Sequence, residues 1–353
     1  MNTGSRMAFL RADGSKTIGM GHLNRVGLVA EMLVKTFQMK PVLITKKNDL
    51  AGHFIHKRNL NVRYLRESMD RKEEMQALSE MMAREQPEMV FVDVLNEDID
   101  PAYMKIFKQT DARVIAVTDD SQRRVIAADV VLNGNPFQSS SWYQKEEGLY
   151  LCGTPYFLMD PAYATTKVKE PHGPVKKVLV TLGGSDHGDL LFRVLEALAK
   201  IHLDLSALVV TSQAAGYLDR LKDFLPTLSL KTELLVDVDS LVHYWPQCDA
   251  AITAGGNTLF ERIASRLPGA TICQLERQNE IADCFEYMEV NMNLGLGNKL
   301  SDEELIFKLK KFLQDKDAQH KQYVRARHIL DGEGLLRLEK EIKNRMREKA
   351  YGL

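Results

Sequence analysis

The sequence predicts an α/β protein made of two doubly wound, Rossmann-like domains that face a cleft, with helices at the C-terminal end. Three features of the 353-residue chain support this prediction. Short runs rich in Val, Ile and Leu alternate with longer amphipathic stretches, which is typical of parallel sheets covered by helices on both faces. The alternation restarts near the middle of the chain, and this length corresponds to about two domains. Glycines follow several of the apolar runs.

In the first half, runs such as MAFLR, PVLIT and MVFVD are apolar and too short for helices, so we expect strands there. The expected strands span residues 7–11, 41–45, 89–93, 114–118 and 129–132. The stretches between them carry apolar residues at helical spacing. They predict helices over 23–37, 51–58, 71–85 and 102–109.

The same alternation returns in the second half, beginning with KVLVT at residue 177. Strands are expected at 177–181, 207–211, 232–236, 250–253 and 270–273. Helices are expected at 190–200, 217–224, 239–245, 259–265 and 278–287. A second doubly wound domain follows from this order of elements.

The boundary between the domains is expected in the segment 160–177, which holds three prolines and few apolar residues. We therefore assign 1–163 to an N-terminal domain and 175–335 to a C-terminal domain. Beyond residue 300 the sequence becomes helical, and Ser301 is placed as a helix cap. The last helix, 336–353, is either a solvated surface helix or a brace that returns to the N-terminal domain.

Composition excludes several classes of protein. Lys and Arg number 47 and Asp and Glu 48, so bulk charge provides neither a nucleic-acid-binding surface nor an electrostatic membrane anchor. No apolar run approaches the ~18 residues that a membrane span needs, and the N-terminus does not read as a signal peptide. A hydrophobic content of 44% excludes disorder. We expect a soluble globular protein, and no feature indicates its oligomeric state.

The cysteines are scattered, with no C-x-x-C pair and no histidine at ligand spacing; they are Cys152, Cys248, Cys273 and Cys284. We therefore expect no disulfide framework, no metal site and no cofactor, and activity that persists in EDTA. Cysteines used in this way favour the cytoplasm as the location.

The loop after the first strand holds glycines just before a predicted helix. Gly19 and Gly21 allow the backbone to approach a ligand closely. A dinucleotide-binding fingerprint would need a third glycine where Asn24 stands, and the second strand ends without an acidic residue. The loop therefore predicts a ligand site but not one for NAD.

His22 is the candidate catalytic residue of this loop. The helix dipole disfavours a positively charged ring at a helix N-terminus, and a neutral imidazole at the mouth of an open α/β sheet suits a general base. An isolated histidine would more often cap or pack at the helix start. The flanking glycines and the nearby Arg11 and Asp13 favour the catalytic interpretation.

In the second half, three polar loops follow strands, and two of them carry a glycine pair. Backbone N–H groups at a glycine turn and a helix start form a cradle for phosphate, and a carboxylate one turn further can accept hydrogen bonds from ribose hydroxyls. Each glycine pair alone would be a tight turn, but the loops together favour a nucleotide site. The candidates are Gly183, Gly184, Ser185, Gly255, Gly256, Asn257, Thr258, Glu261, Arg277 and Gln278.

Carboxylates also end two strands of the first half: Asp93 in VFVDVL, and Asp119 with Asp120 in AVTDDS. They would either hold hydroxyl or amide groups of a sugar or cap the next helix, and the two interpretations are about equally supported. The candidates for substrate binding are Arg11, Asp13, Gly19, Gly21, Asn24 and Asp93.

These motifs together resemble those of the UDP-sugar hydrolases of the pseudaminic-acid pathway, which are relatives of the MurG-type glycosyltransferases with a GT-B fold. The resemblance spans residues 7–297 and rests on RADGS, GMGH, VFVDVL, AVTDDSQRR, YLCGTPYFLMDPAY, VLVTLGGSDHGDLL, CDAAITAGGNTLFERI and RQNEIADCFEY. Each motif is weak alone, and the ordered set is specific.

The resemblance implies hydrolysis of UDP-2,4-diacetamido-2,4,6-trideoxy-β-L-altrose, with water activated by His22 and UDP held by the C-terminal domain. The chain departs from the family at Leu95, where a tyrosine is expected, and at Arg277, where an asparagine is expected. Two alternatives stay open: a GT-B glycosyltransferase of surface-polysaccharide biosynthesis and a catalytically silent nucleotide-sugar-binding subunit.

Overall fold

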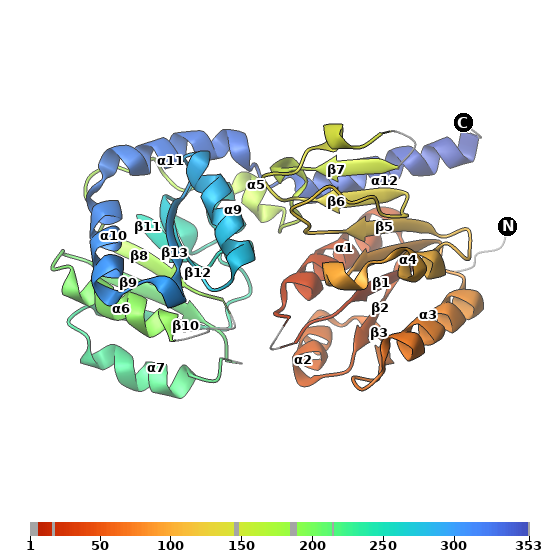
Figure 1. Ribbon diagram of the computed structural model, residues 1–353, viewed down its shortest axis with the longest axis horizontal. Coiled ribbons are helices and arrows are strands. Elements are labelled where there is room, and N and C mark those ends of the chain that lie inside the picture. Colours follow the sequence, from red (N-terminus) through yellow and green to blue (C-terminus); the bar gives the residue numbers. More distant parts are fainter. Residues whose placement is uncertain (1–5, 16–17, 145–147, 184–188, 214, 352–353) are drawn as a thin grey trace. The chain divides into compact units, whose positions relative to one another are not determined.

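The computed structural model describes all residues except 1–5, 16–17, 145–147, 184–188, 214 and 352–353. The chain divides into two compact units. Unit 1 comprises residues 1–160 together with 333–353, and unit 2 comprises 161–332. Each unit contains one parallel β-sheet with helices on both faces (Figure 1).

The sheet of unit 1 has seven parallel strands in the order β3-β2-β1-β4-β5-β6-β7. The strands are β1 (Met7–Ala12), β2 (Lys40–Lys46), β3 (Asn61–Leu65), β4 (Met89–Asp93), β5 (Arg113–Val117), β6 (Val130–Asn133) and β7 (Leu149–Cys152). The helices are α1 (Gly21–Phe37), α2 (Asp49–Arg58), α3 (Arg71–Glu85), α4 (Pro101–Phe107) and α12 (Gly334–Tyr351).

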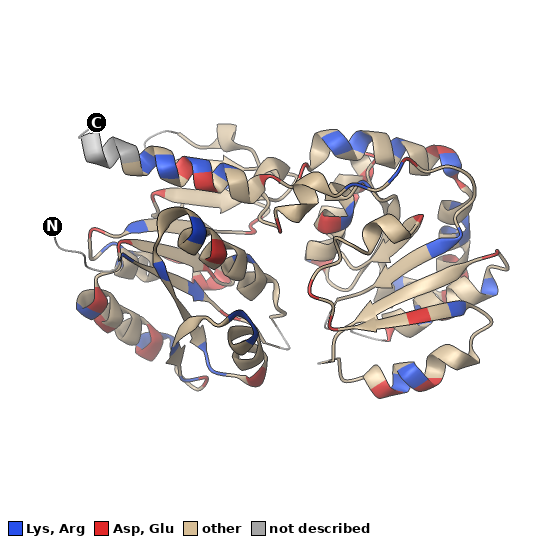
Figure 2. Ribbon diagram, turned by 180° about the vertical axis from the view of Figure 1, so that it is seen from behind, with Lys and Arg blue, Asp and Glu red and all other residues tan. Residues whose placement is uncertain are grey.

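Alternating side chains of the central strand β1 enter opposite cores of unit 1, because successive residues of a strand face opposite sides of the sheet. Leu10 packs in a core with α1, α2 and α12. Phe9 packs in a second core with α3 and α4. Helix α12 contributes Leu335, Leu338 and Ile342 to the first core, so the C-terminal helix is part of unit 1. Along α12 and α3, basic and acidic residues are interspersed (Figure 2).

The sheet of unit 2 has six parallel strands in the order β10-β9-β8-β11-β12-β13. The strands are β8 (Lys177–Thr181), β9 (Ser206–Thr211), β10 (Lys231–Val236), β11 (Ala250–Thr253), β12 (Gly269–Cys273) and β13 (Met292–Leu296). The helices are α5 (Ala162–Thr165), α6 (Leu190–Lys200), α7 (Leu218–Phe224), α8 (Asn257–Ala264), α9 (Glu276–Tyr287), α10 (Asp302–Gln314) and α11 (Lys316–Ile329). Val178 and Val180 of β8 pack in a core with α6 and α10.

The strand order reverses once in each sheet, between β1 and β4 in unit 1 and between β8 and β11 in unit 2. In doubly wound sheets ligands bind beyond the carboxyl ends of the strands at such a switch point, where the neighbouring loops diverge. The loops after β1 and β4, and those after β8 and β11, are therefore the candidate ligand-binding loops.

Every strand predicted from the sequence is present, which confirms the doubly wound α/β prediction. Three strands were not predicted: β3, β7 and β13. All three lie at sheet edges, and β3 and β13 are only partly buried. A partly exposed strand lacks the continuous apolar run by which the buried strands are recognised.

One expected helix was wrong. Residues 239–245 do not form an α-helix; a 3₁₀ turn, Trp245–Gln247, follows instead, and Pro246 within it has no backbone N–H to donate. The chain divides after residue 160, within the segment 160–177 where the boundary was expected, and residues 161–174 belong to unit 2. Tyr163 is buried there, and the Val168 N–H donates to the Ser265 carbonyl oxygen at 3.0 Å.

Candidate active site

His22 lies in the first turn of α1, one residue after the helix begins. The loop before it folds back on itself: Gly19 has a φ of 80°, and its N–H donates to the Ser15 carbonyl oxygen at 2.8 Å. A positive φ is strained for residues with a side chain, so this turn explains the glycine. The loop places the His22 ring beyond the carboxyl end of β1, with 12% of its side chain exposed.

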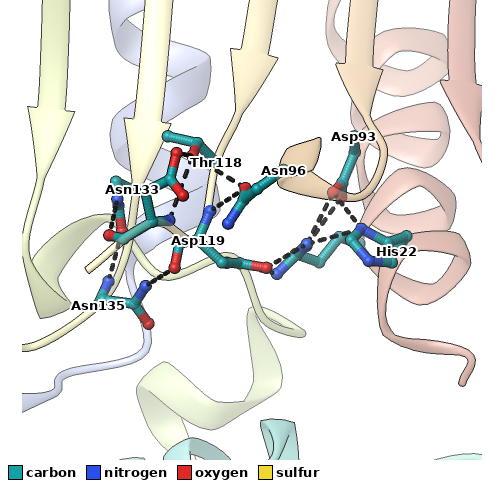
Figure 3. A network of polar contacts seen from close by, with 9 residues as sticks. His22, Asp93, Asn96, Thr118, Asp119, Asn133 and Asn135 are labelled. Atoms are coloured by element: carbon teal, nitrogen blue, oxygen red, sulfur yellow. Dashed lines mark hydrogen bonds and ion pairs between the residues drawn. The ribbon is translucent and has the colours of Figure 1, made fainter. Parts of the chain in front are cut away.

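Asp93, the last residue of β4, holds the ring of His22. Its Oδ1 lies 2.6 Å from His22 Nδ1, and its side chain is completely buried (Figure 3). Burial alone would raise the pKa of Asp93, but the charge of Arg25 and the contact with His22 lower it, so the carboxylate is ionised. An ionised carboxylate only accepts hydrogen bonds, and we therefore assign the proton to Nδ1 of His22. The lone pair of the ring is then on Nε2.

Arg25, one turn further along α1, completes this arrangement. Its Nε and Nη2 donate to the two oxygens of Asp93 at 2.8 and 2.7 Å, a bidentate contact. Its Nη1 and Nη2 also donate to the oxygens of Asp119, both at 3.2 Å. Burial lowers the pKa of Arg25, but the charges of Asp119 and Asp93 raise it well above the usual value. Arg25 therefore stays charged and fixes the carboxylate that orients His22.

The loop that carries Asp119 is fixed in turn by amide side chains at neighbouring strand ends (Figure 3). Asn96 Oδ1 accepts from Thr118 Oγ1 at 3.0 Å and from the Asp119 N–H at 3.1 Å. Asn135 Nδ2 donates to the Asp119 carbonyl oxygen at 2.8 Å, and Asn133 Nδ2 donates to that of Asp120 at 3.0 Å. The carboxyl ends of β4, β5 and β6 are thus joined into one rigid polar network.

Arg11 and Asp13 are buried and bind partners inside unit 1. Arg11 is 1% exposed, and its Nη2 donates to Asp13 at 2.6 Å and to Glu74 at 2.7 Å, while its Nε donates to Tyr103 at 3.0 Å. Asp13 is also buried, and its other oxygen accepts from the Lys46 N–H at 2.8 Å. These charges form an internal cluster that joins β1, β2, α3 and α4, and the use of Arg11 and Asp13 in substrate binding stays a prediction.

Both oxygens of the buried Asp93 are used by His22 and Arg25, and its predicted contact with the substrate stays a prediction. Gly19 and Gly21 shape the loop before His22, and Asn24 is exposed on α1 two residues beyond it. The use of Asn24 in substrate binding stays a prediction.

In unit 2, the expected glycine loops follow the two strands of the switch point. Gly183, after β8, has a φ of 82°, and Gly184 and Ser185 lie outside the described residues. After β11, a Cβ on Gly255 would lie 2.6 Å from the Cβ of Gln278, so this glycine permits close packing against α9. A Cβ on Gly256 would meet nothing within 4 Å, so space is open beside the start of α8.

Helix α8 begins immediately after Gly256, with Asn257 and Thr258 half-buried in its first turn. The N-terminus of a helix presents N–H groups and a positive dipole, which suit a phosphate. Glu261 lies one turn further, and its Oε2 accepts from the Tyr163 hydroxyl at 3.1 Å. The predicted phosphate and ribose groups of the site thus lie on one short helix.

The remaining predicted contacts lie at the start of α9. Arg277 is exposed in the first turn of this helix. Gln278 Oε1 accepts from the Gln274 N–H at 2.9 Å, so this amide oxygen stabilises the turn before the helix. Gln274 Nε2 donates to the Leu182 carbonyl oxygen at 3.2 Å, which joins the loops after β8 and β12.

Asp119 was expected to hold a sugar or to cap a helix, and Arg25 was not among the predicted site residues. The available signal was the spacing of His22 and Arg25, three residues apart, which places both on one side of a helix. Their common partner Asp93 lies about seventy residues away and is identified only by strand pairing between β1 and β4.

Within the part of the chain that the structure describes, no group of three or more His, Cys, Asp or Glu side chains is arranged to hold a metal ion. Among the helices that the structure describes, none is long and apolar enough to cross a membrane. Burial raises the pKa of Cys273 to about 12, and its thiol is therefore protonated at neutral pH.

No protein-family model matches the chain. The spore coat polysaccharide biosynthesis protein SpsG of Bacillus subtilis is 25% identical to it over 334 residues, which cover 93% of this chain and 95% of SpsG.

Solved structures similar to this chain share its fold at low sequence identity. MurG of Acinetobacter baumannii superposes with a TM-score of 0.68 at 11% identity, over 96% of this chain and 99% of MurG. The calicheamicin glycosyltransferase CalG4 gives 0.68 at 13% identity, over 99% and 100% of the two chains. MnaA of S. aureus, solved with UDP, gives 0.65 at 12% identity, over 99% and 98%. The chain therefore has the GT-B fold that its motifs predicted.

Proposed function

We propose that this protein is a nucleotide-sugar-dependent glycosyltransferase of surface-polysaccharide biosynthesis. The observation that carries the proposal is the His22–Asp93 pair beyond the carboxyl ends of β1 and β4, where an oriented imidazole can act as a general base. The similarity to SpsG along nearly the whole chain supports the polysaccharide context, and the GT-B neighbours support glycosyl transfer.

In the proposed reaction, Nε2 of His22 takes the proton from a hydroxyl group of the acceptor. The acceptor oxygen attacks the anomeric carbon of the donor sugar, and the carbon–oxygen bond to the nucleoside diphosphate breaks. The electron pair of that bond leaves with the diphosphate. Asp93 stabilises the imidazolium that forms, and Arg25 holds Asp93 in place. Attack from the face opposite the leaving group inverts the anomeric configuration.

Unit 2 is proposed to bind the nucleotide. The similarity of the fold to MnaA, which was solved with UDP, supports this proposal. The N–H groups at the start of α8 would meet the diphosphate, and Glu261 would accept hydrogen bonds from the ribose. Donors aimed at the diphosphate make it a better leaving group, because negative charge develops on it as the bond breaks. Arg277, exposed on α9, is a candidate for a bidentate phosphate contact.

A second candidate is the hydrolysis of UDP-2,4-diacetamido-2,4,6-trideoxy-β-L-altrose. The motifs over residues 11–25 and their continuation to residue 297 favour it. Water would replace the acceptor hydroxyl, and the same Nε2 would take its proton, since a general base at this position serves water and alcohols equally.

The experiment that separates the candidates follows the donor by NMR, using UDP-2,4-diacetamido-2,4,6-trideoxy-β-L-altrose and UDP-N-acetylglucosamine with and without a mixture of saccharide acceptors. Release of UDP only when an acceptor is present would support transfer. Release of UDP and free sugar without an acceptor would establish hydrolysis. UDP binding without turnover of any donor would instead indicate a binding subunit, and no UDP binding would contradict the nucleotide site.

A further inference from the structure

A buried hydroxyl contacts the carboxylate of Glu261 in unit 2. Tyr163, on α5, is 1% exposed, and its hydroxyl lies 3.1 Å from Glu261 Oε2. The indole Nε1 of the fully buried Trp245 lies 3.4 Å from the same hydroxyl. The side chain of Ser240 is a further hydrogen-bonding partner of this hydroxyl. Three elements of unit 2 thus converge on the tyrosine oxygen that contacts Glu261.

The chemistry of these groups sets the direction of the hydrogen bonds. An indole N–H only donates, so the Tyr163 oxygen accepts from Trp245. Burial raises the pKa of Tyr163, and the charge of Glu261 raises it further, so the hydroxyl keeps its proton. A carboxylate only accepts, and the proton of Tyr163 therefore points to Glu261.

The position of Tyr163 is fixed independently of Glu261. Lys167, one turn later in the chain, donates through Nζ to the carbonyl oxygens of Tyr163 and of Ala264, the latter at 2.8 Å. Ala264 is the last residue of α8, the helix that carries Glu261. The lysine therefore holds α5 against the same helix, and the Tyr163 hydroxyl has a fixed direction relative to the Glu261 carboxylate.

We propose that Tyr163 is a positioning residue that orients Glu261 to read the ribose hydroxyls of the bound nucleotide, so that unit 2 selects a ribonucleoside diphosphate over its 2′-deoxy analogue. This inference rests on the proposed nucleotide-binding function of unit 2. A carboxylate held in one orientation accepts from ribose hydroxyls without the entropic cost of ordering a mobile side chain. A nucleotide that lacks the 2′-hydroxyl leaves one of those hydrogen bonds unmade, at a charged acceptor where the loss is largest.

The test measures the affinity of the full chain for UDP and for 2′-deoxy-UDP by calorimetry. The unmodified protein is expected to bind UDP at least about tenfold more tightly, the loss expected for a hydrogen bond to a charged group. Tyr163→Phe is expected to weaken UDP binding by about three- to tenfold while changing 2′-deoxy-UDP binding less than about twofold. The preference for the ribonucleotide thus falls, which a purely structural tyrosine would not cause.

The matched control is Tyr103→Phe in unit 1. Tyr103 is also fully buried, and its hydroxyl donates to a glutamate, Glu74, at 2.9 Å. This variant loses an equivalent hydrogen bond far from Glu261 in the chain and is expected to keep the ribonucleotide preference. If Tyr163→Phe does not fold, Ser240→Ala removes a hydrogen-bonding partner of the same hydroxyl and is expected to lower the preference in the same direction.

The outcomes separate this inference from the function on which it rests. Tight UDP binding with an unchanged preference in Tyr163→Phe and Ser240→Ala would overturn the role of Tyr163 alone. Equal binding of UDP and 2′-deoxy-UDP by the unmodified protein would overturn the reading of ribose by Glu261. Failure of the unmodified protein to bind either nucleotide would overturn the inference together with the nucleotide-binding function of unit 2.

Discussion

The switch points of the two sheets have the same topology but offer different chemistry. In unit 1 the groups beyond the strand ends are ionisable side chains in a largely buried network: His22, Arg25, Asp93 and Asp119. In unit 2 the corresponding loops present glycine backbone and the first turn of α8. Proton transfer needs a side chain in a fixed tautomer, whereas a phosphate is bound well by backbone N–H groups. The comparison teaches that strand order fixes where a site lies, while the loop residues fix what it does.

The largest effect is expected from removing the base of unit 1. His22→Ala should lower the release of UDP from its donor by about 10²- to 10⁴-fold, the usual contribution of a general base. UDP affinity should change by less than about twofold, because the nucleotide groups are assigned to unit 2. His53→Ala, at an exposed histidine of α2, is the control and should keep full turnover. Equal losses in both variants would contradict a catalytic His22.

Asp93→Asn tests whether the network of unit 1 orients this base. Turnover should fall by about 10²-fold or more, because the amide can hold His22 in the wrong tautomer. The free energy of unfolding should fall by about 3 kcal/mol, since Arg25 loses its buried charged partner. Rate measurements and denaturant unfolding check the two effects separately. A stable variant with full turnover would contradict the role of Asp93 in orienting His22.

The pH dependence of the unfolding free energy tests the ion pair of Asp93 more directly. Folding lowers the pKa of Asp93, so its ionisation stabilises the native state above the pKa of the unfolded chain, about 4. That stabilisation is lost as the pH falls through the lower pKa of the folded state. The difference in unfolding free energy between the unmodified protein and Asp93→Asn should therefore be constant near neutral pH and shrink below about pH 4. A difference that grows on acidification would contradict the ion pair.

Two neighbouring glycines test the backbone site of unit 2. Gly255→Ala places a Cβ 2.6 Å from that of Gln278 and should destabilise the fold by about 1–3 kcal/mol through overpacking. Gly256→Ala meets open space and should change stability by less than about 0.5 kcal/mol. If the diphosphate lies against this backbone, Gly256→Ala should still weaken UDP binding. Calorimetry showing unchanged UDP affinity in Gly256→Ala would remove this loop from the nucleotide site.

The nucleotide itself should stabilise the folded protein. UDP at about one hundred times its dissociation constant should add about 2.7 kcal/mol to the stability of the folded state, a shift of a few degrees in thermal melting. His22→Ala should show the same shift, since the binding groups belong to unit 2. A shift that disappears in His22→Ala would show that nucleotide binding depends on unit 1. That result would contradict the assignment of the nucleotide-binding groups to unit 2 alone.

Some elements could be predicted from the sequence because a local property defines them. The buried strands at 89–93, 177–181 and 250–253 were predicted with the bounds that the structure has, since each is a short apolar run between polar residues. The helices at 71–85 and 190–200 were likewise predicted to the residue. The edge strands β3 and β13 were missed because a strand with only one neighbour does not need to be apolar on both faces.

The candidate site was predictable only in part. His22, the glycine loops and Glu261 follow directly from motifs within a few residues of one another. The partners of Arg11 could not be predicted, because the motif shows that Arg11 is close to His22 in the chain but not that Glu74 and Tyr103 bind it inside unit 1. Tyr163 was not considered, since its partners Glu261 and Trp245 lie about eighty residues or more away in sequence.

By itself the sequence determined the fold class, the position of the loops at strand ends and the identity of the candidate base, because hydrophobic periodicity and glycine turns are local properties of the chain. Only the tertiary structure decided which charges meet. Strand pairing brings Asp93 to His22 and Arg25, and packing of α5 on α8 brings Tyr163 to Glu261. Such contacts join residues that are distant in the chain, and their burial makes each hydrogen bond and ion pair depend on partners that local patterns cannot specify.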